Sequence, residues 1–241
     1  MKLFLTSSPS GALDVPNYDK VLDESNGFVD MLKNEWKDHM RGLIICADPY
    51  CYEGNDEMCD FFTQAFRHSG VEVLSFDLWD YRVNEYSEEM INQYDVIMIG
   101  GGHVPTQNSY FRHIGLKSII ENYEGIVIGV SAGTMNCANI VYAFPEEEGE
   151  SIDPDYKRFI PGLGLTNLNI LPHYQMVKDY YLDGVRLYED IAYPDSYGHP
   201  FLVLEDGSFV YGDYVYGKSY ILYNGILELY CKNNEKRLIE F

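Results

Sequence analysis

The stretch Gly125-Ile126-Val127-Ile128-Gly129-Val130-Ser131-Ala132-Gly133-Thr134 decides the fold. A short apolar run passes directly into a G-x-S-x-G sequence, and a helix-compatible segment follows it through Val141. This order is typical of a nucleophile elbow, in which a serine lies at the tip of a strained turn between a strand and a helix. Gly129 and Gly133 would leave space for the crossing, so Ser131 is the predicted nucleophile. The alternative is a purely structural glycine-rich turn.

Further apolar runs surround this elbow, and each is closed by Gly, Pro, Ser or Asp. We expect strands at residues 3–6, 42–47, 71–76, 96–100 and 125–130. The segments between them are predicted helices, at residues 26–36, 56–68, 87–94 and 109–122, with Asn55-Asp56 as the N-cap of the second. Near-continuous apolar strands that alternate with helices predict a three-layer α/β fold with a mostly parallel, doubly wound sheet. Functional residues are then expected at the carboxyl ends of the strands.

The texture of the sequence changes after about residue 201. Short β-prone runs are punctuated there by turn signals such as Asp206-Gly207 and Asn224-Gly225. We expect an antiparallel extension over about residues 201–241, on one edge of the sheet. A chain of 241 residues suits one large α/β domain, so residues 1–241 are interpreted as a single domain.

Composition excludes several kinds of partner. The formal charge of −21 repels phosphate backbones and anionic lipid headgroups, so neither nucleic acid nor a membrane is an expected partner. The five cysteines are odd in number and form no C-x-x-C pair, which indicates reduced, buried thiols rather than disulfides or a zinc site. The first apolar run is too short for a signal peptide, and a cytoplasmic location is the resulting expectation.

A glycine-rich loop, Gly100-Gly101-Gly102-His103, ends the strand predicted before the elbow strand. In a parallel sheet it would lie beside Ser131, where its backbone N–H groups can donate hydrogen bonds. Acyl transfer needs two donors aimed at the developing oxyanion, and the amides of Gly102 and Ala132 are the predicted pair, with Gly101 as a further candidate. Binding of a phosphate group by this loop is the alternative.

His173 is the predicted general base, because it follows an apolar run at residues 168–171 and a proline, at the end of a predicted strand. His103, in the glycine-rich loop, is the competing candidate. A carboxylate is also needed to orient the imidazole. Acidic residues between Ser131 and His173 are candidates for this role: Glu146, Glu147, Glu148, Glu150 and Asp153.

Three motifs together resemble the aspartyl dipeptidase (dipeptidase E) family of serine peptidases, whose close relatives are the cyanophycinases. They are G-G-G at 100–102, G-V-S-A-G at 129–133 and G-L-G-L-T-N-L-N-I-L-P-H-Y at 162–174. The resemblance covers roughly residues 3–174 and implies a class I glutamine-amidotransferase-like fold. It also implies that Ser131 is the nucleophile, that His173 is the histidine, and that the Gly102 and Ala132 amides form the oxyanion hole.

The resemblance also implies an acid about 15 to 18 residues after the serine, in the chain order serine, acid, histidine. That window contains Glu146, Glu147 and Glu148, which the motif does not separate, and Glu147 is the chosen candidate.

Substrate recognition is predicted for Gly101, His103 and Arg186. The family's dipeptidases have Asn where this chain has His103, and they use a basic residue after the histidine to read a substrate carboxylate. Arg186 is the nearest such residue, and a bidentate grip on a carboxylate suits arginine. The alternative is a surface ion pair of Arg186 with Glu189 or Asp190.

These observations predict a serine-type peptidase that hydrolyses small peptides, dipeptides with N-terminal Asp in particular, through an acyl-enzyme and without metal or organic cofactor. A homodimer is a further expectation. Glutamine amidotransfer is one alternative, although it resembles a cysteine nucleophile with a His-x-Glu pair, and this chain has Ser131 and His173-Tyr174-Gln175. A non-catalytic small-molecule binding protein of the same fold is the other.

Overall fold

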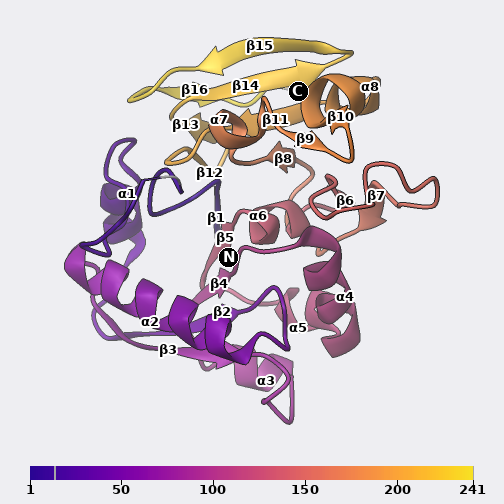
Figure 1. The fold of residues 1–241 in the computed structure, drawn as a ribbon. Helices are drawn as coiled ribbons and strands as arrows, with labels where there is room; N and C mark the ends of the chain where they lie inside the picture. Colours follow the sequence, from indigo (N-terminus) through magenta and orange to yellow (C-terminus); the bar gives the residue numbers. More distant parts are fainter. Residues whose placement is uncertain (14, 241) are drawn as a thin grey trace.

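The computed structural model describes residues 1–13 and 15–240. Its centre is an eight-stranded sheet with the strand order β16-β13-β12-β1-β5-β4-β2-β3 (Figure 1). The strands from β1 to β3 in this order pair in parallel, and β12, β13 and β16 continue the sheet antiparallel beyond β1. The predicted mostly parallel α/β sheet is confirmed.

The main sheet contains these strands: β1 (Lys2–Thr6), β2 (Met40–Ile45), β3 (Val73–Trp79), β4 (Val96–Ile99), β5 (Ile126–Val130), β12 (Phe209–Tyr211), β13 (Tyr214–Tyr216) and β16 (Lys236–Leu238). A second sheet contains β8 (Asn169–Leu171), β11 (Phe201–Leu204), β14 (Ser219–Tyr223) and β15 (Ile226–Cys231). Two short pairs complete the strands: β6 (Ile140–Tyr142) with β7 (Phe159–Pro161), and β9 (Tyr181–Leu182) with β10 (Val185–Arg186).

Helices lie between these strands. They are α1 (Phe28–Glu35), α2 (Tyr52–His68), α3 (Glu88–Ile91), α4 (Val104–Ile114), α5 (Leu116–Ile120), α6 (Ala132–Asn136), α7 (Tyr174–Val177), the π-helical turn η1 (Leu187–Ala192) and α8 (Tyr193–Asp195).

Both faces of the main sheet are covered, because its strands are apolar at consecutive positions. In β2, Ile44 packs with α1 and α2, whereas its neighbours Leu43 and Ile45 pack with α3, α4 and α5. Successive side chains of a strand point to opposite faces, so an uninterrupted apolar run supplies two cores at once. A third core joins α6, β8, β11 and η1.

Several predicted boundaries differ from the structure. The helix predicted at 56–68 begins at Tyr52, so Asn55 lies inside it and is not its N-cap. The segment 109–122 forms two helices, because Gly115 at φ 69° ends α4 and begins α5. The segment after Ser131 is helical only through Asn136 and re-enters a strand at Ile140.

The predicted antiparallel extension on one edge of the sheet is confirmed for part of the C-terminal segment, and the other C-terminal strands lie elsewhere. β12, β13 and β16 extend the main sheet, while β11, β14 and β15 belong to the second sheet, which lies across the carboxyl ends of the parallel strands (Figure 1). The chain between β11 and β12 therefore passes from one sheet to the other. This crossing places residues 205–208 next to the carboxyl end of β1.

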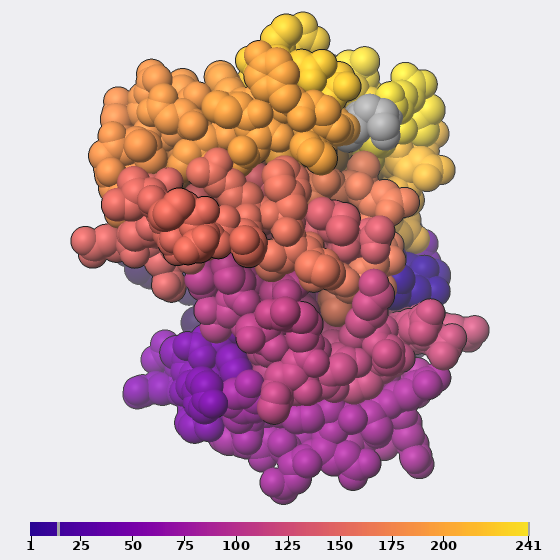
Figure 2. Space-filling view, turned by 90° about the vertical axis from the view of Figure 1, so that its right-hand side faces the viewer, coloured from indigo at the N-terminus to yellow at the C-terminus, as the bar shows by residue number. Residues whose placement is uncertain are grey.

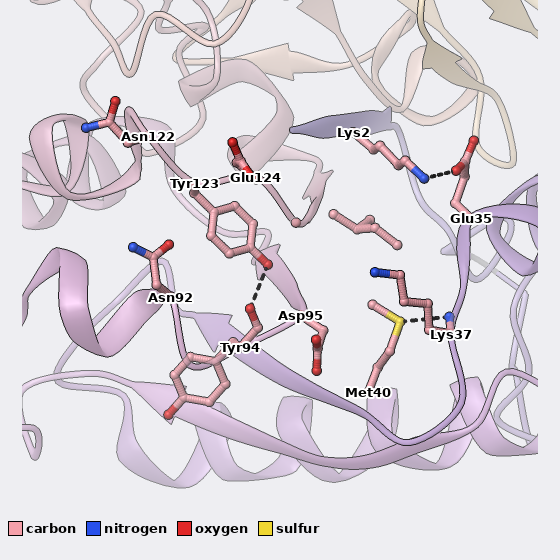
Figure 3. Close-up of a pocket in the computed structure, with 12 residues that line it drawn as sticks. Lys2, Glu35, Lys37, Met40, Asn92, Tyr94, Asp95, Asn122, Tyr123 and Glu124 are labelled. Carbon is pink, nitrogen blue, oxygen red and sulfur yellow. Dashed lines mark hydrogen bonds and ion pairs between the residues drawn. The ribbon is translucent and has the colours of Figure 1, made fainter.

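A cavity of about 520 Å³ lies at the opposite end of the main sheet, next to the amino ends of β1, β4 and β5. Figure 3 shows its lining, with the ion pair of Lys2 and Glu35 and the hydroxyl of Tyr123 donating to the carbonyl of Tyr94. Ser131 follows the carboxyl end of β5, so this cavity is remote from the elbow. Among the described residues, no helix is both long and apolar enough to cross a lipid bilayer.

Candidate active site

Ser131 occupies a strained turn between β5 and α6. Its backbone has φ 52° and ψ −116°, a conformation that L-residues rarely adopt, and its N–H donates to the carbonyl oxygens of Thr6 and Ser7 at 3.2 and 3.1 Å. A Cβ on Gly133 would lie 2.1 Å from the carbonyl oxygen of Ile99, and one on Gly129 would lie 2.8 Å from Cα of Thr134. The two flanking glycines are therefore required by close backbone contacts, as the elbow motif predicts.

The glycine-rich loop lies beside the elbow, since β4 and β5 are parallel neighbours with Ile99 opposite Gly129. A Cβ on Gly101 would lie 3.2 Å from Cβ of Ser131, so Gly101 is next to the predicted nucleophile. Gly102 has φ 152° and faces Ala47 closely. In the described part of the chain, the amides of Gly102 and Ala132 have no hydrogen-bond partner. Both predicted oxyanion donors are thus available beside Ser131.

His173 lies between Ser131 and a buried carboxylate. Its Nε2 accepts a hydrogen bond from the hydroxyl of Ser131 at 2.7 Å. The residue has φ 58° and precedes α7, and its backbone N–H donates to Oγ of Ser7 at 2.9 Å. The structure therefore brings together the predicted nucleophile and the predicted base. His103, the competing candidate, does not contact Ser131.

The carboxylate that contacts His173 is Asp206, not Glu147. Nδ1–H of His173 donates to Oδ1 of Asp206 at 2.5 Å, and the Asp206 side chain is only 1% exposed. Glu147 lies near His103 instead, with a side chain that is 67% exposed and a carboxylate oxygen 3.8 Å from Nδ1 of His103. The choice of Glu147 is therefore wrong, and neither Glu146 nor Glu148 takes its place. The chain order is serine, histidine, aspartate.

The second sheet delivers His173 and Asp206 to the same place. β8 and β11 are parallel neighbours, with Leu171 opposite Val203. His173 follows the end of β8 and Asp206 follows the end of β11, so both lie at the same edge of that sheet. The turn that contains Asp206 is fastened to the end of β1, because Gly207 N–H donates to the carbonyl of Ser8 at 3.2 Å. Asp206-Gly207 is a crossing between two sheets, whereas Asp-Gly more often marks a hairpin between neighbouring strands.

Two polar side chains hold the carboxylate of Asp206. The hydroxyl of Ser7 donates to Oδ1 at 2.7 Å, while Nε2 of Gln175 donates to Oδ2 at 2.5 Å. Oε1 of Gln175 also accepts from the backbone N–H of Asp206 at 3.1 Å. Gln175 is the residue that replaces the glutamate of a His-x-Glu pair. It is neutral, and it positions the aspartate that supplies the charge.

The charge of Asp206 is maintained despite its burial. Desolvation alone would raise the pKa of this carboxyl group. The hydrogen bond from His173 and the positive charge of that imidazole when it is protonated, with hydrogen bonds from Ser7 and the amide of Leu13, outweigh desolvation and lower the pKa below its usual value. Asp206 is therefore an anion at neutral pH and can stabilise an imidazolium on His173.

Of the three residues predicted to bind substrate, Gly101 lies next to Ser131, whereas His103 and Arg186 form other contacts. Gly101 lies at the nucleophile, as described above. His103 is held away from it, because its Nε2–H donates to Glu150 at 2.8 Å and its Nδ1 contacts the hydroxyl of Thr106 at 2.8 Å. Arg186 forms the surface ion pair considered as the alternative, with a two-pronged contact to Asp190 at 2.7 and 3.1 Å.

A cavity of about 340 Å³ opens on Ser131 and His173. Its walls are mostly apolar, and its polar side chains besides these two are Glu146 and Tyr180. Arg186 is not in its lining. The cavity is lined by residues from the elbow and from the segment around α7. Figure 2 shows that the middle of the chain (salmon) lies between the earlier elements (magenta) and the C-terminal part (orange and yellow).

One group of described side chains has ligand atoms close enough to surround a metal ion: His103, Glu147 and Glu150, with all three atoms within 4.8 Å of one another. They already form the hydrogen bond and the ion pair given above. This group is separate from the hydrogen-bonded side chains of Ser131, His173 and Asp206.

Comparisons with known proteins agree with this fold and identify the family of the chain. The model of peptidase family S51 matches residues 30–211. The fold is similar to the crystal structure of a peptidase from an acI-B1 Actinobacterium, with a TM-score of 0.64, 15% identity and coverage of 99% of this chain and 96% of that one. It is also similar to a putative peptidase E protein from Listeria monocytogenes EGD-e, with a TM-score of 0.51, 15% identity and coverage of 95% and 98%. No curated protein sequence matches the chain.

Proposed function

Since the chain belongs to peptidase family S51 and is a serine peptidase, we propose that it cleaves short peptides with Ser131 as nucleophile, His173 as general base and Asp206 as the orienting acid. The observation that carries this assignment is the unbroken hydrogen-bond chain from Ser131 through His173 to Asp206, at 2.7 and 2.5 Å. It stands at the carboxyl end of β5, next to the amides of Gly102 and Ala132, which have no hydrogen-bond partner among the described residues.

The proposed reaction follows from these contacts. His173 Nε2 takes the hydroxyl proton of Ser131 as Oγ attacks the peptide carbonyl carbon, and Asp206 stabilises the resulting imidazolium. The amides of Gly102 and Ala132 bind the oxyanion of the tetrahedral intermediate. The imidazolium then gives its proton to the leaving amine, which leaves an ester of Ser131. Water, deprotonated by His173, hydrolyses that ester and regenerates the serine.

The specificity for N-terminal aspartate is a separate part of the proposal. It requires a cation in the cavity to bind the aspartate side chain, and Arg186 was its candidate. Arg186 is exposed and occupied by Asp190, so it would have to leave that ion pair and turn toward the cavity. An aspartyl preference therefore depends on a rearrangement, whereas cleavage of short peptides in general does not.

Both alternatives are less well supported. Glutamine amidotransfer would place a carboxylate at Gln175, whose amide instead positions Asp206. A purely binding role would not need the strained backbone of Ser131 or the hydrogen bond of its hydroxyl to His173. The cytoplasmic location and the homodimer stay predictions, to be tested by cell fractionation and by sedimentation.

Hydrolysis of Asp-Leu and Leu-Leu by the wild type and by Ser131→Ala tests the proposal. Cleavage of either peptide that is lost in Ser131→Ala supports the serine mechanism, and cleavage of Asp-Leu alone supports the aspartyl preference. Wild-type protein that cleaves neither peptide and fails to react with a fluorophosphonate would argue for a binding role.

A further inference from the structure

The cavity beside Ser131 has a carboxylate on its wall that the proposed reaction does not use. Glu146 lines it together with apolar side chains such as Phe144, Val177 and Leu187. His173 is the only titratable nitrogen in the described lining, and it is engaged with Ser131 and Asp206. The described lining therefore combines apolar walls with one carboxyl group and contains no lysine or arginine.

Glu146 is fixed in position relative to the oxyanion loop. Oε2 of Glu150 accepts hydrogen bonds from the amides of Glu146 and Glu147 at 2.9 and 3.0 Å. Oε1 of the same carboxylate accepts from His103, the residue that follows Gly102, at 2.8 Å. One carboxylate thus ties the backbone of Glu146 to the loop that carries an oxyanion donor.

A second set of contacts anchors the far side of this acidic segment. The carboxylate of Asp183 accepts from the amide of Gly149 at 2.9 and 3.0 Å and from the hydroxyl of Ser151 at 2.7 Å. The segment from Glu146 to Ser151 is therefore held at both ends, and a ligand at Glu146 would meet a prepared surface.

The surroundings of Glu146 favour a cation. The side chain is exposed to the cavity, yet the protein packed around it and the neighbouring charges of Glu150 and Glu147 raise its pKa to about 8, against the opposing effect of the Val104 amide. With this pKa the carboxyl group is largely protonated at pH 7 in the empty cavity, because protein atoms do not compensate its negative charge. A bound cation would favour the ionised form and pair with it, and the formal charge of −21 on the whole chain attracts cations in general.

We propose that Glu146 is a specificity-determining residue that binds a primary ammonium group of the peptide substrate, next to the apolar walls that receive an uncharged side chain. The inference rests on the proposed peptidase function and names its substrate class: short peptides with a protonated amino group near the scissile bond. Two sources supply this group, the free α-ammonium of the N-terminal residue and the side chain of lysine. An additional carboxylate, as in Asp-Leu, finds no lysine or arginine in the described lining of the cavity and gains no affinity.

Binding to Ser131→Ala tests the inference without depending on catalysis. Leu-Leu, N-acetyl-Leu-Leu, N-acetyl-Lys-Leu and Asp-Leu are titrated calorimetrically into this variant and into the same variant that also carries Glu146→Gln. Glu148→Gln is the matched control, because Glu148 is exposed, outside the cavity lining and subject to the same change of charge.

Leu-Leu is expected to bind Ser131→Ala about ten- to a hundred-fold more tightly than N-acetyl-Leu-Leu, the range of a hydrogen bond to a charged group. Glu146→Gln should abolish this difference, and Glu148→Gln should preserve it. If N-acetyl-Lys-Leu binds as tightly as Leu-Leu, the lysine side chain is a second source of the ammonium group. If it binds as weakly as N-acetyl-Leu-Leu, the α-ammonium is the group that Glu146 binds.

Four results would each overturn the inference. They are equal binding of Leu-Leu and its acetylated form, no effect of Glu146→Gln on the binding of Leu-Leu, tighter binding of Asp-Leu than of Leu-Leu, and no binding of any peptide. A charge reversal, Glu146→Lys, provides a second check that does not rely on loss of binding, because it should invert the order and favour Asp-Leu. Failure of the peptidase proposal is recognised separately, as absence of cleavage and of fluorophosphonate labelling in the wild type.

Discussion

Replacing Asp206 with Asn changes one atom of the triad and should nearly abolish turnover. The carboxylate accepts from His173 and Ser7 at Oδ1 and from Gln175 and Leu13 at Oδ2, at distances of 2.5 to 3.3 Å. An amide has one oxygen, so one of these pairs of donors must face an NH₂ group. The imidazolium that forms on His173 also loses its negative partner inside the protein.

The expected loss in kcat is about 10³- to 10⁴-fold, or roughly 4 to 5.5 kcal/mol of transition-state stabilisation. The carboxylate is almost fully buried, at 1% exposure, so water cannot take its place. The assay is hydrolysis of whichever short peptide the wild type cleaves best, together with the rate of fluorophosphonate labelling. Thermal unfolding of each variant separates loss of chemistry from loss of fold.

Glu147→Gln is the matched control, since it makes the same chemical change on a carboxylate that is 67% exposed and lies near His103. Its kcat should remain within about threefold of the wild-type value, as for a surface substitution outside the reacting groups. The reasoning is refuted if Asp206→Asn retains more than a tenth of wild-type kcat, or if Glu147→Gln loses as much activity as Asp206→Asn.

Three other perturbations should have distinct effects. Ser7→Ala leaves Asp206 and the His173 amide without their shared hydroxyl, so kcat and the labelling rate should fall about tenfold, at a stability cost of about 1 to 3 kcal/mol in urea unfolding. Gly133→Ala places a Cβ 2.1 Å from the Ile99 carbonyl oxygen and should cost about 3 kcal/mol or more in the same assay, and an unchanged midpoint would contradict the close crossing at the elbow. The lowered pKa of Asp206 means that its charged form stabilises the fold at pH values above about 4, and that this contribution is lost as the pH falls through the folded-state pKa. In urea unfolding, the wild-type protein should therefore lose more stability between pH 7 and pH 3 than Asp206→Asn does. Equal losses would count against the stabilising contacts of the Asp206 carboxylate.

Much of the architecture is determined by local sequence and could therefore be predicted. The apolar runs that form β1, β2, β4 and β5 were located to within two residues, because buried parallel strands need continuous apolar sequence. The elbow was equally readable, since backbone contacts at Gly129 and Gly133 leave no room for a side chain. Helix ends were less accurate where a single glycine decided them, as Gly115 does between α4 and α5.

The acid of the triad was missed because its position depends on tertiary structure. Asp206 belongs to a turn that crosses between two sheets, and the pairing of β8 with β11 that brings it to His173 joins strands about 30 residues apart. Its Asp-Gly sequence is also a common hairpin signal, which favoured the wrong interpretation. One local signal was present: Asp206 follows an apolar strand almost directly, as Ser131 and His173 do.

Peptide mapping of the fluorophosphonate adduct tests the central claim most directly. Wild-type protein should carry one adduct, on Ser131, and Ser131→Ala should carry none, while Asp206→Asn should react at a rate reduced by at least about a hundredfold. An adduct on another serine such as Ser7, or an unmodified wild-type protein that still hydrolyses peptides, would contradict the assignment of Ser131, His173 and Asp206 as the catalytic triad.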